Sequence, residues 1–382
     1  MKDLLEIRQE IDEIDQEMVR LYQQRMGLAE EVAAYKIANH KNVYDKEREQ
    51  QKLDKLSGMA KDDFLRQGVL ELFEQIMSTS RKRQYKIMAE QGLMDTNLHF
   101  TCCDSFDYTD KKIVFQGVEG AYAQMAMYEF FGEDCMGSAV ATWRDAMEAI
   151  HSKEADYAVL PIENSSAGIV GENYDLLNEY DVCIIGEQVI KIEHALLGLP
   201  GASIDDIQTV YSHPQALMQC ANYLEVEHPQ WESKAKKNTA VSALKVKEDN
   251  DISKAAIASI QNAKIYDLQV LQEAIQDEAD NETRFIIVSK EKKYLKDADK
   301  VSLCFELPHE KGSLYHILSH FIFNGVNMTK IESRPKKGVN WEYQFFIDVQ
   351  GNLANDDILS ALRGLKEETG SFKVIGNYKS FD

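Results

Sequence analysis

Apolar side chains recur at heptad spacing along the first 38 residues, and this pattern constrains the fold more than any other feature of the sequence. The two apolar rows contain Leu4, Ile11, Met18 and Val32, and Ile7, Ile14, Leu21, Leu28 and Tyr35. Spacing of this kind predicts one long amphipathic helix whose apolar edge must be covered. Such a helix would be on the order of 55 Å long.

Residues 1–91 are predicted to be helical almost throughout, because they contain no proline and break their pattern only around 39–45. A second helix is expected over 46–56 and a third over 62–91. Two shorter helices cannot cover the first along its whole length. We therefore expect a second copy of the chain to cover it.

Arg25 interrupts the first apolar row, in the slot between Met18 and Val32. A guanidinium group keeps its proton, so its burial without an anionic partner is strongly unfavourable. We therefore expect either a protein carboxylate or a bound acid to pair with Arg25 on this apolar edge, called the seam below. Ser80 and Gln84 continue the apolar face of the third helix and place polar groups on the same seam.

Further charged residues flank the seam. Lys36 lies near the end of the first helix, and Asp45, Arg48 and Glu49 cluster at the start of the second. Arg8 is far from Arg25 along the same helix, so it would most naturally serve the pocket of a second copy. Taken singly, Arg8, Lys36 and Glu49 are ordinary surface charges, but Arg25 with Ser80 and Gln84 favours a joint site.

The charge balance restricts the partners of the chain. There are 43 Lys and Arg against 64 Asp and Glu, which gives a net charge of −21. A field of that sign disfavours nucleic acid and anionic membranes, and a site for a dianionic metabolite must gather its own positive charge.

No run of 18 apolar residues occurs, and the first residues are too charged for a signal peptide. The six cysteines form no CxxC pair, which is typical of reduced thiols in a cytoplasmic protein. His316 and His320 could share a helix face, but no third ligand is evident, so no metal is expected. The sequence also contains no GxGxxG, which argues against a nicotinamide cofactor.

The N-terminal residues resemble the intertwined all-helical chorismate mutases. The matching pattern is Leu5-x-x-Arg8, Gln24-Arg25, Lys36, Asp45-x-x-Arg48-Glu49 and Ser80-x-x-x-Gln84. The resemblance implies that Arg25 and Arg8, the latter from the other subunit, hold the two carboxylates of chorismate. It places Lys36 and Gln84 at the ether oxygen, Glu49 and Asp45 at the hydroxyl and backbone region, and Arg48 and Ser80 at the carboxylates. A pericyclic rearrangement needs only a folded substrate and donors where negative charge grows on the ether.

From residue 112 the sequence alternates strand, loop and helix. Strands are predicted at 113–116, 157–161, 209–211 and 255–258, and a last one at 285–289. This alternation implies a largely parallel sheet with ligand-binding loops at the carboxyl ends of the strands. Residues 92–111 show no clear period and are expected to be a linker.

Three loops in this segment carry polar residues at predicted helix starts: GVEGAY at 117–122, PIENSSAG at 161–168 and SHPQ at 212–215. Each loop alone is explained by helix capping, and Ser212 before Pro214 is a good N-cap. Together with Thr283-Arg284-Phe285, the loops make residues 112–290 resemble the prephenate dehydratases. The family has two α/β lobes like those of periplasmic binding proteins, with the substrate in the cleft.

The resemblance gives Thr283 the central role, as a positioned donor to the departing ring hydroxyl in a dehydration coupled to decarboxylation. His213 is a second candidate for the acid, and Arg284 holds either local structure or a carboxylate. The residues expected around prephenate are Asn164, Ser165, Ser212, Gln219, Thr283, Arg284 and Phe285. Ala121 and Ala123 stand where the family usually has hydroxyl residues, so only Tyr122 and backbone N–H groups are expected to contact substrate from that loop.

Residues 300–382 predict the order βαββαβ of a ferredoxin-like fold, with strands at 301–307, 326–333, 341–349 and 372–378 and helices at 313–323 and 356–368. They resemble the ACT domains of dehydratases. The matching phenylalanine-binding residues are Gly312, Ser313, Leu314, Glu332, Ser333, Arg334 and Pro335. The resemblance implies a phenylalanine held between two paired sheets, its carboxylate at the Gly312 amides; the alternative is a plain dimerisation module.

The expected molecule is therefore multidomain: an all-α mutase domain at 1–91, a linker at 92–111, an α/β dehydratase domain at 112–290 and an α+β ACT regulatory domain at 300–382. It would be a cytoplasmic homodimer or larger homo-oligomer without cofactor, converting chorismate to prephenate and prephenate to phenylpyruvate under feedback by L-phenylalanine. Two alternatives remain open. One is a ligand-sensing protein without turnover, and the other a mutase whose dehydratase is disabled by the altered glycine loop.

Overall fold

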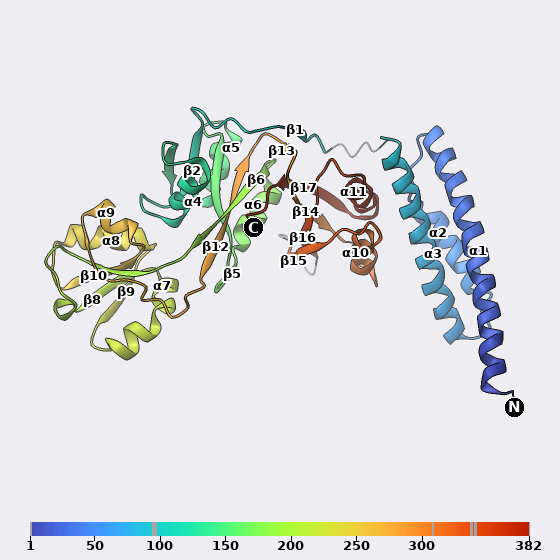
Figure 1. The fold of residues 1–382 in the computed structure, drawn as a ribbon, viewed down its shortest axis with the longest axis horizontal. Helices are drawn as coiled ribbons and strands as arrows, with labels where there is room; N and C mark the ends of the chain where they lie inside the picture. Colours follow the sequence, from blue (N-terminus) through green and yellow to red (C-terminus); the bar gives the residue numbers. More distant parts are fainter. Residues whose placement is uncertain (1, 94–97, 308, 337–338, 340–341, 382) are drawn as a thin grey trace. The chain divides into compact units, whose positions relative to one another are not determined.

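The computed structural model describes residues 2–93, 98–307, 309–336, 339 and 342–381 (Figure 1). The chain divides into two compact units. The first contains Met1–His99 and Val301–Val374, and the second contains Phe100–Lys300 and Ile375–Asp382.

Three helices begin the first unit, close to their predicted bounds: α1 (Leu4–Ala38), α2 (Lys46–Ser57) and α3 (Asp63–Glu90). Aspartates start the second and third helices. The carboxylate of Asp45 accepts from the backbone N–H of Arg48 at 3.1 Å, and that of Asp62 from Leu65 at 2.8 Å. Such caps satisfy backbone donors that have no partner within the helix.

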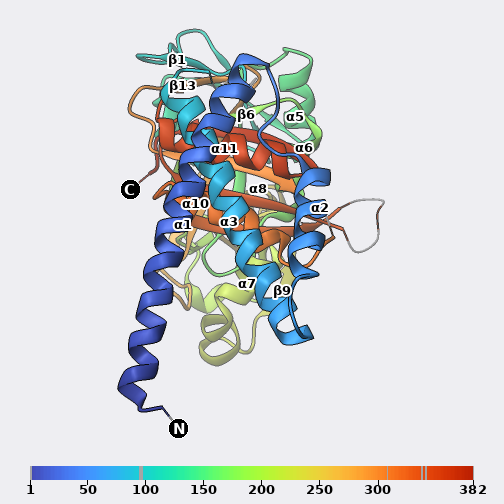
Figure 2. The same ribbon diagram turned by 90° about the vertical axis from the view of Figure 1, so that its right-hand side faces the viewer.

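The apolar edge of α1 is largely uncovered in a single chain. Within α1 only Ala29 and Ala33 are buried, and the N-terminal turns extend past α2 and α3 (Figure 2). In the predicted rows, Ile14 is 60% exposed and Leu21 50% exposed. A continuous apolar stripe of this length marks an interaction surface.

The C-terminal segment, of which Val301–Val374 belongs to the first unit, confirms the predicted order of elements. Its elements are β14 (Lys300–Glu306), α10 (Ser313–Phe323), β15 (Met328–Pro335), β16 (Tyr343–Gln350), α11 (Asp356–Glu368) and β17 (Ser371–Tyr378). The strands lie in the order β15-β16-β14-β17, so β15 is an edge strand. Both helices pack toward α3 in this unit.

The second unit contains two larger sheets, each with its own apolar core. The strands of the first are β2 (Lys112–Gln116), β3 (Met136–Val140), β4 (Tyr157–Asn164), β6 (Cys183–Lys191) and β12 (Glu282–Ser289), with β5 (Gly168–Ile169) paired to β4. The strands of the second are β7 (Ala195–Gly198), β8 (Thr209–Ser212), β9 (Glu232–Ala235), β10 (Lys254–Ala258) and β11 (Gln269–Gln272).

Each of these two sheets forms a lobe together with the helices that follow its strands; the sheet that contains β2 belongs to the first lobe and the sheet that contains β7 to the second. They are α4 (Tyr122–Phe131), α5 (Trp143–His151), α6 (Gly171–Glu179), α7 (Pro214–Gln219), α8 (Thr239–Asp249) and α9 (Gln261–Tyr266), with a 3-10 turn at Ile204–Asp206 and a π-helical segment at Asn222–Glu227. The chain passes from the first lobe to the second after β6 and returns before β12, so two segments connect the lobes (Figure 1).

Two expectations need correction here. The sheets are mixed rather than largely parallel, because β12 returns from the second lobe and runs antiparallel to both β4 and β6. Nor is the whole of 92–111 a linker. Residues Thr101–Cys103 form β1, parallel to β13 (Lys293–Leu295), and the aromatic rings of Phe106 and Tyr108 pack on the first-lobe core.

Candidate active sites

A cavity of 370 Å³ lies among the three N-terminal helices. Its lining includes seven of the eight residues predicted for this region: Arg25, Lys36, Asp45, Arg48, Glu49, Ser80 and Gln84. The eighth, Arg8, lies exposed near the start of α1 and does not line the cavity. Residues from three helices, far apart in sequence, are thus brought to one site.

Arg25 is half-buried in this cavity. Its Nη1 donates to the backbone oxygen of Ile76 at 3.4 Å, and burial lowers the pKa of Arg25 while the charge of Glu49 opposes that shift. Among the residues that the structure describes, Arg25 forms no ion pair with a carboxylate, and Glu49 acts on it only through its charge. The positive charge predicted on the seam is therefore available to an acid from outside the chain.

Gln84 and Lys36 are also held at the cavity. The Gln84 side chain is buried, its Nε2 donates to the Ser80 backbone oxygen at 3.2 Å, and its Oε1 has no hydrogen-bond partner among the described residues. Lys36 donates from Nζ to the backbone oxygen of Val43 at 2.6 Å, and burial lowers its pKa. A buried amide with an unsatisfied atom is costly unless a ligand or water meets it.

Cations that the sequence did not single out also line this cavity, namely Lys41, Lys52 and Arg81. With Arg25, Lys36 and Arg48 they make six cationic side chains against the two carboxylates Asp45 and Glu49. Burial and the nearby charges of Arg25 and Arg48 lower the pKa of Lys52. Lys52 follows Arg48 by one helical turn, so spacing could have identified it.

Arg81 is the most buried of these cations, with 8% of its side chain exposed. It forms ion pairs with Glu49 and with Glu368 of α11, the latter at 2.8 Å from Nε. His320 of α10 lies 3.2 Å from the same Glu368 carboxylate. Burial raises the pKa of Glu368, but His320 and Arg81 outweigh it and lower the pKa to about 2. Because burial also lowers the pKa of His320, Arg81 supplies most of the positive charge at neutral pH.

This ion pair predicts an acid-dependent stability. The pKa of Glu368 is about 2 in the folded chain against an ordinary value of 4.5, so its contribution is complete above pH 4.5 and is lost as the pH falls toward 2. The Glu368→Gln variant should therefore be less stable than wild type by about 3 kcal/mol at pH 7. Urea unfolding at pH 7, 4 and 2.5 should show the difference shrink with acid; an equal difference at all three would contradict the assignment.

A second polar site lies where β4 and β12 pair in the second unit. Thr283 is opposite Asn164 in the antiparallel register, and Asn164 Nδ2 donates to Thr283 Oγ1 at 2.9 Å. The same amide donates to Asn281 Oδ1 at 2.8 Å. Because the Thr283 oxygen accepts from this amide N–H, the O–H of Thr283 points away from Asn164 and can donate to another group.

The network continues from Asn164 into the second lobe. Ser166 Oγ lies 3.1 Å from Asn164 Oδ1, Gln219 Nε2 donates to Ser166 Oγ at 3.1 Å, and Gln219 Oε1 lies 3.0 Å from His194 Nε2. Burial lowers the pKa of His194. A cavity of 290 Å³ is lined by Ser166, Gln219 and Asn281 among others. Sequence reasoning missed Ser166, His194 and Asn281.

Other residues predicted for this site lie in its supporting structure. Ser165 bonds to backbone groups of Asp280 and Glu282, and Ser212 is fully buried and donates to Ile257 O at 2.7 Å. The N-cap of α7 is His213, rather than Ser212: its Nδ1 accepts from Gln215 N.

The side chains of the two residues after Thr283 contact other residues of the chain. Arg284 forms ion pairs with Glu163 and Glu187 at 3.2 and 3.1 Å, and the Phe285 side chain lies in the first-lobe core. Tyr122 donates to the backbone oxygen of Glu193 at 2.7 Å and lies 3.3 Å from His194 Nδ1, so this tyrosine reaches the network from the altered glycine loop.

A third cavity, of 250 Å³, is lined by Gly312, Ser313 and Leu314 at the start of α10. The other predicted effector residues, Glu332, Ser333, Arg334 and Pro335, lie on the edge strand β15 and do not line this cavity. In a single chain, therefore, only the first of the two predicted motifs lines this cavity.

Within the described part of the chain, no group of three or more potential metal ligands occurs. No helix there combines the length and apolar character needed to span a bilayer.

Two family profiles match separate segments of the chain. The family profile described as chorismate mutase type II matches residues 7–85, and that described as prephenate dehydratase matches residues 113–293. The bifunctional chorismate mutase/prephenate dehydratase of Aquifex aeolicus (strain VF5) is 33% identical over 99% of this chain and 98% of its own length.

Two solved structures are each similar to about 70% of this chain. The prephenate dehydratase of Arthrobacter aurescens in complex with L-Phe has a TM-score of 0.65 and 32% identity, over 70% of this chain and 89% of that chain. GqqA, described as a novel type of quorum quenching acylase, has a TM-score of 0.65 and 30% identity, over 71% of this chain and 98% of that chain.

Proposed function

The chain belongs to the family of bifunctional chorismate mutase/prephenate dehydratases, and we propose that each of the two sites described above carries one of the two reactions. The cavity among α1, α2 and α3 rearranges chorismate to prephenate. The Thr283 network converts prephenate to phenylpyruvate. The observation that carries the first assignment is Arg25, a half-buried guanidinium that forms no ion pair with a described carboxylate in a cavity lined by six cations.

The mutase site acts by binding and by electrostatics. Chorismate carries two carboxylates, and Arg25 holds one of them while Arg48 and the Ser80 hydroxyl assist. Lys36 Nζ and the second N–H of Gln84 Nε2, whose first N–H bonds to Ser80 O, donate to the ether oxygen, where negative charge grows as the C–O bond breaks. No nucleophile or base is required, because the rearrangement takes place within one molecule. The site needs only to hold the substrate in the folded, near-attack conformation.

The second carboxylate requires Arg8 from another chain. Arg8 lies outside the cavity of its own chain, while the apolar edge of α1 is largely exposed. A homodimer formed along α1 would cover that edge and bring Arg8 of the partner subunit to the cavity. Dimerisation and catalysis would then depend on the same helix.

The dehydratase site acts on the ring hydroxyl of prephenate. The bond between the ring carbon and its carboxylate breaks, carbon dioxide leaves, and the electron pair enters the ring as the hydroxyl departs. The departing hydroxyl takes up a proton and leaves as water, and the Thr283 hydroxyl is the group that we propose donates to it. Asn164 fixes the Thr283 oxygen, and Ser166, Gln219 and His194 extend the network.

Acyl transfer, suggested by the GqqA description, is the second candidate for this domain. It would require Thr283 to act as a nucleophile activated by a base. The neighbour of the Thr283 oxygen is the Asn164 amide, which donates a hydrogen bond and cannot accept the hydroxyl proton. The geometry therefore favours a hydrogen-bond donor over a nucleophile.

Incubation of the purified chain with chorismate tests the function directly. Absorbance of phenylpyruvate should appear, preceded by prephenate. Loss of chorismate that stops at prephenate would support a mutase without a dehydratase. Unchanged chorismate would support the alternative of a ligand-sensing protein.

Regulation by phenylalanine is assigned to the C-terminal domain, which we take to be an ACT domain. The support is its βαββαβ order, the Gly312-Ser313-Leu314 and Glu332-Ser333-Arg334-Pro335 segments, and the L-Phe complex of the Arthrobacter aurescens relative. The backbone N–H groups after Gly312 would bind the carboxylate of the effector. The β15 segment of a paired second sheet would complete the site, and inhibition requires that one arrangement binds phenylalanine better.

Gly312 offers a selective test of this assignment. Its φ is 78°, and an added Cβ would lie 3.3 Å from the imidazole Nε2 of His316. The Gly312→Ala variant should keep both basal activities and require at least about tenfold more phenylalanine for half-inhibition. Gly201→Ala is the control for backbone strain alone: Gly201 is an exposed loop residue with a φ of 86°, and an added Cβ would have no atom within 4 Å. Unchanged inhibition of the Gly312→Ala variant would place the effector elsewhere.

A further inference from the structure

Arg81 joins the wall of the mutase cavity to the C-terminal helix α11. Its Nη1 donates to Glu49 Oε2, and its Nε and Nη2 donate to the two Glu368 oxygens at 2.8 and 3.2 Å. The guanidinium also lies 4.9 Å from the centroid of the Tyr44 ring. One side chain of α3 thus holds residues of α2 and α11.

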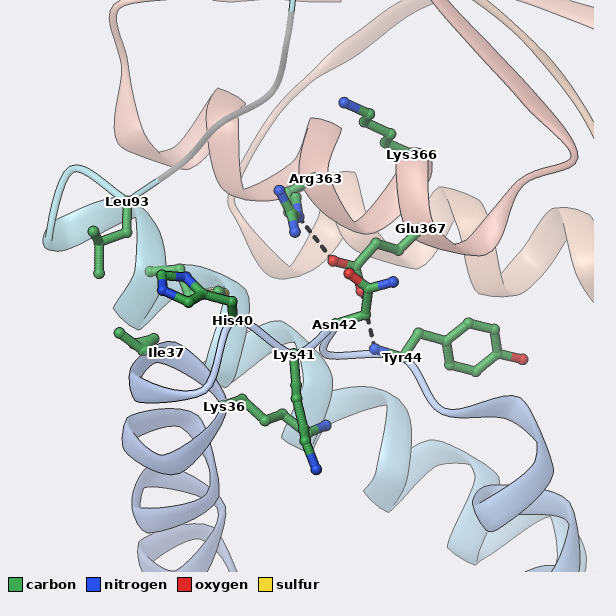
Figure 3. Close-up of a pocket in the computed structure, with 11 residues that line it drawn as sticks. Lys36, Ile37, His40, Lys41, Asn42, Tyr44, Leu93, Arg363, Lys366 and Glu367 are labelled. Carbon is green, nitrogen blue, oxygen red and sulfur yellow. Dashed lines mark hydrogen bonds and ion pairs between the residues drawn. The ribbon is translucent and has the colours of Figure 1, made fainter.

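Glu367, the neighbour of Glu368, lines a separate cavity of 580 Å³ that shares Lys36 with the mutase cavity and also includes Tyr44 (Figure 3). Its Oε2 accepts from the Tyr44 backbone N–H at 2.9 Å and its Oε1 accepts from Arg363 at 2.8 Å (Figure 3). The same Oε2 also accepts from the Tyr85 hydroxyl at 3.0 Å. Tyr44 lies between Val43, which accepts from Lys36, and Asp45, which caps α2. Two consecutive residues of α11 therefore support both the Lys36 side and the Glu49 side of the mutase cavity.

Glu49 needs such support because five other cations share its cavity. A glutamate side chain has several rotamers, and unsupported it could pair with any of these cations. Bonding of Oε2 to Arg81 leaves Oε1 for a substrate hydroxyl. Burial of Arg81 between two carboxylates is a poor device for stability alone, since an apolar side chain of similar volume often serves as well or better.

We propose that Arg81 is a positioning residue of the mutase reaction: it fixes the Glu49 carboxylate toward the ring hydroxyl of chorismate, and Glu368 anchors it from behind. This inference rests on the proposed mutase function of the cavity. The ring hydroxyl remains on the ring through the rearrangement, so its contact with Glu49 is nearly equal in substrate and transition state. Loss of a contact of this kind raises KM more than it lowers kcat.

The test is a double-mutant cycle in the full-length protein, with chorismate as substrate. Arg81→Gln should raise the KM for chorismate about tenfold and change kcat by less than about threefold. Glu49→Gln should raise KM by a similar factor. Addition of Arg81→Gln to Glu49→Gln should then change KM by less than about twofold, because both substitutions remove the same contact.

Arg81→Lys keeps one positive charge and can pair with one carboxylate, so its KM should lie between wild type and Arg81→Gln. Arg83→Gln, on the same helix in an exposed pair with Glu30, is the matched control and should leave KM unchanged. Prephenate turnover by each variant reports that the chain has folded.

Two results would overturn the inference. Multiplicative effects of the two glutamine substitutions would show that Arg81 acts other than through Glu49, and an unchanged KM for Arg81→Gln would show that it does not act on substrate binding. Either result, obtained with a wild-type protein that converts chorismate, leaves the proposed function intact. A wild-type protein that does not convert chorismate would instead remove the proposed function and this inference with it.

Discussion

Replacement of Arg25 by alanine is expected to lower the mutase kcat/KM by about a thousandfold, which corresponds to about 4 kcal/mol of lost transition-state stabilisation. Arg25 is half-buried, and its guanidinium forms no ion pair with a described carboxylate. Its removal deprives a substrate carboxylate of charge-assisted hydrogen bonds and leaves that carboxylate poorly solvated in the cavity. Steady-state consumption of chorismate measures the loss.

The matched control is Arg20→Ala. Arg20 lies on the same helix and is exposed in a pair with Glu17, so its removal should leave mutase turnover within about twofold of wild type. Prephenate turnover by the Arg25→Ala variant should be unchanged, since Arg25 and Thr283 lie in different units of the chain. Equal losses of both activities would refute the assignment of two sites.

Replacement of Thr283 by valine should lower dehydratase turnover by about a thousandfold while mutase turnover persists. Valine preserves the shape of threonine and removes the hydroxyl, and a positioned proton donor contributes roughly 10²–10⁴-fold to the rate of such a step. The Asn164 amide would lose one of its acceptors but keep Asn281. Formation of phenylpyruvate from added prephenate is the measurement.

Thr283→Ser is the companion variant, because it restores the hydroxyl without the methyl group. It should retain at least about a tenth of wild-type dehydratase turnover. If the valine variant remained active, the donor would have to be another group of the network, and His194 or Ser166 would be the next candidates.

Much of the helical site could be predicted from sequence because its signal is local. Arg25 was noticeable only because its neighbours at seven-residue spacing are apolar, and Ser80 and Gln84 because they continue one helix face. The same periodicity placed α1, α3 and both C-terminal helices close to their observed bounds. Periodic burial is the physical origin of each of these predictions.

Contacts between distant segments could not be predicted in this way. Arg81 and Glu368 are 287 residues apart, and the sequence around either residue does not predict its contact with the other. Ser165 and Ser166 differ in what they bond because of the turn after β4, which the sequence alone does not define. The direction of β12 likewise follows from the path of the chain through the second lobe.

The charge of the chain gives the mutase cavity its significance. A protein with a net charge of −21 repels a dianion over most of its surface, yet six cationic side chains line one cavity of 370 Å³. Local concentration of positive charge in a partly buried site attracts and orients an anionic substrate despite the opposing net field.

Co-expression of two variants tests the completion of this cavity by a second chain most directly. The Arg8→Ala and Arg25→Ala homodimers should each have little mutase activity, because every site lacks one of its two arginines. In a heterodimer isolated with two different tags, one site keeps both arginines and the other loses both, so about half of the wild-type mutase rate should return. A heterodimer as inactive as its parents would show that Arg8 of the partner subunit does not complete the site, and would contradict this account of the mutase cavity.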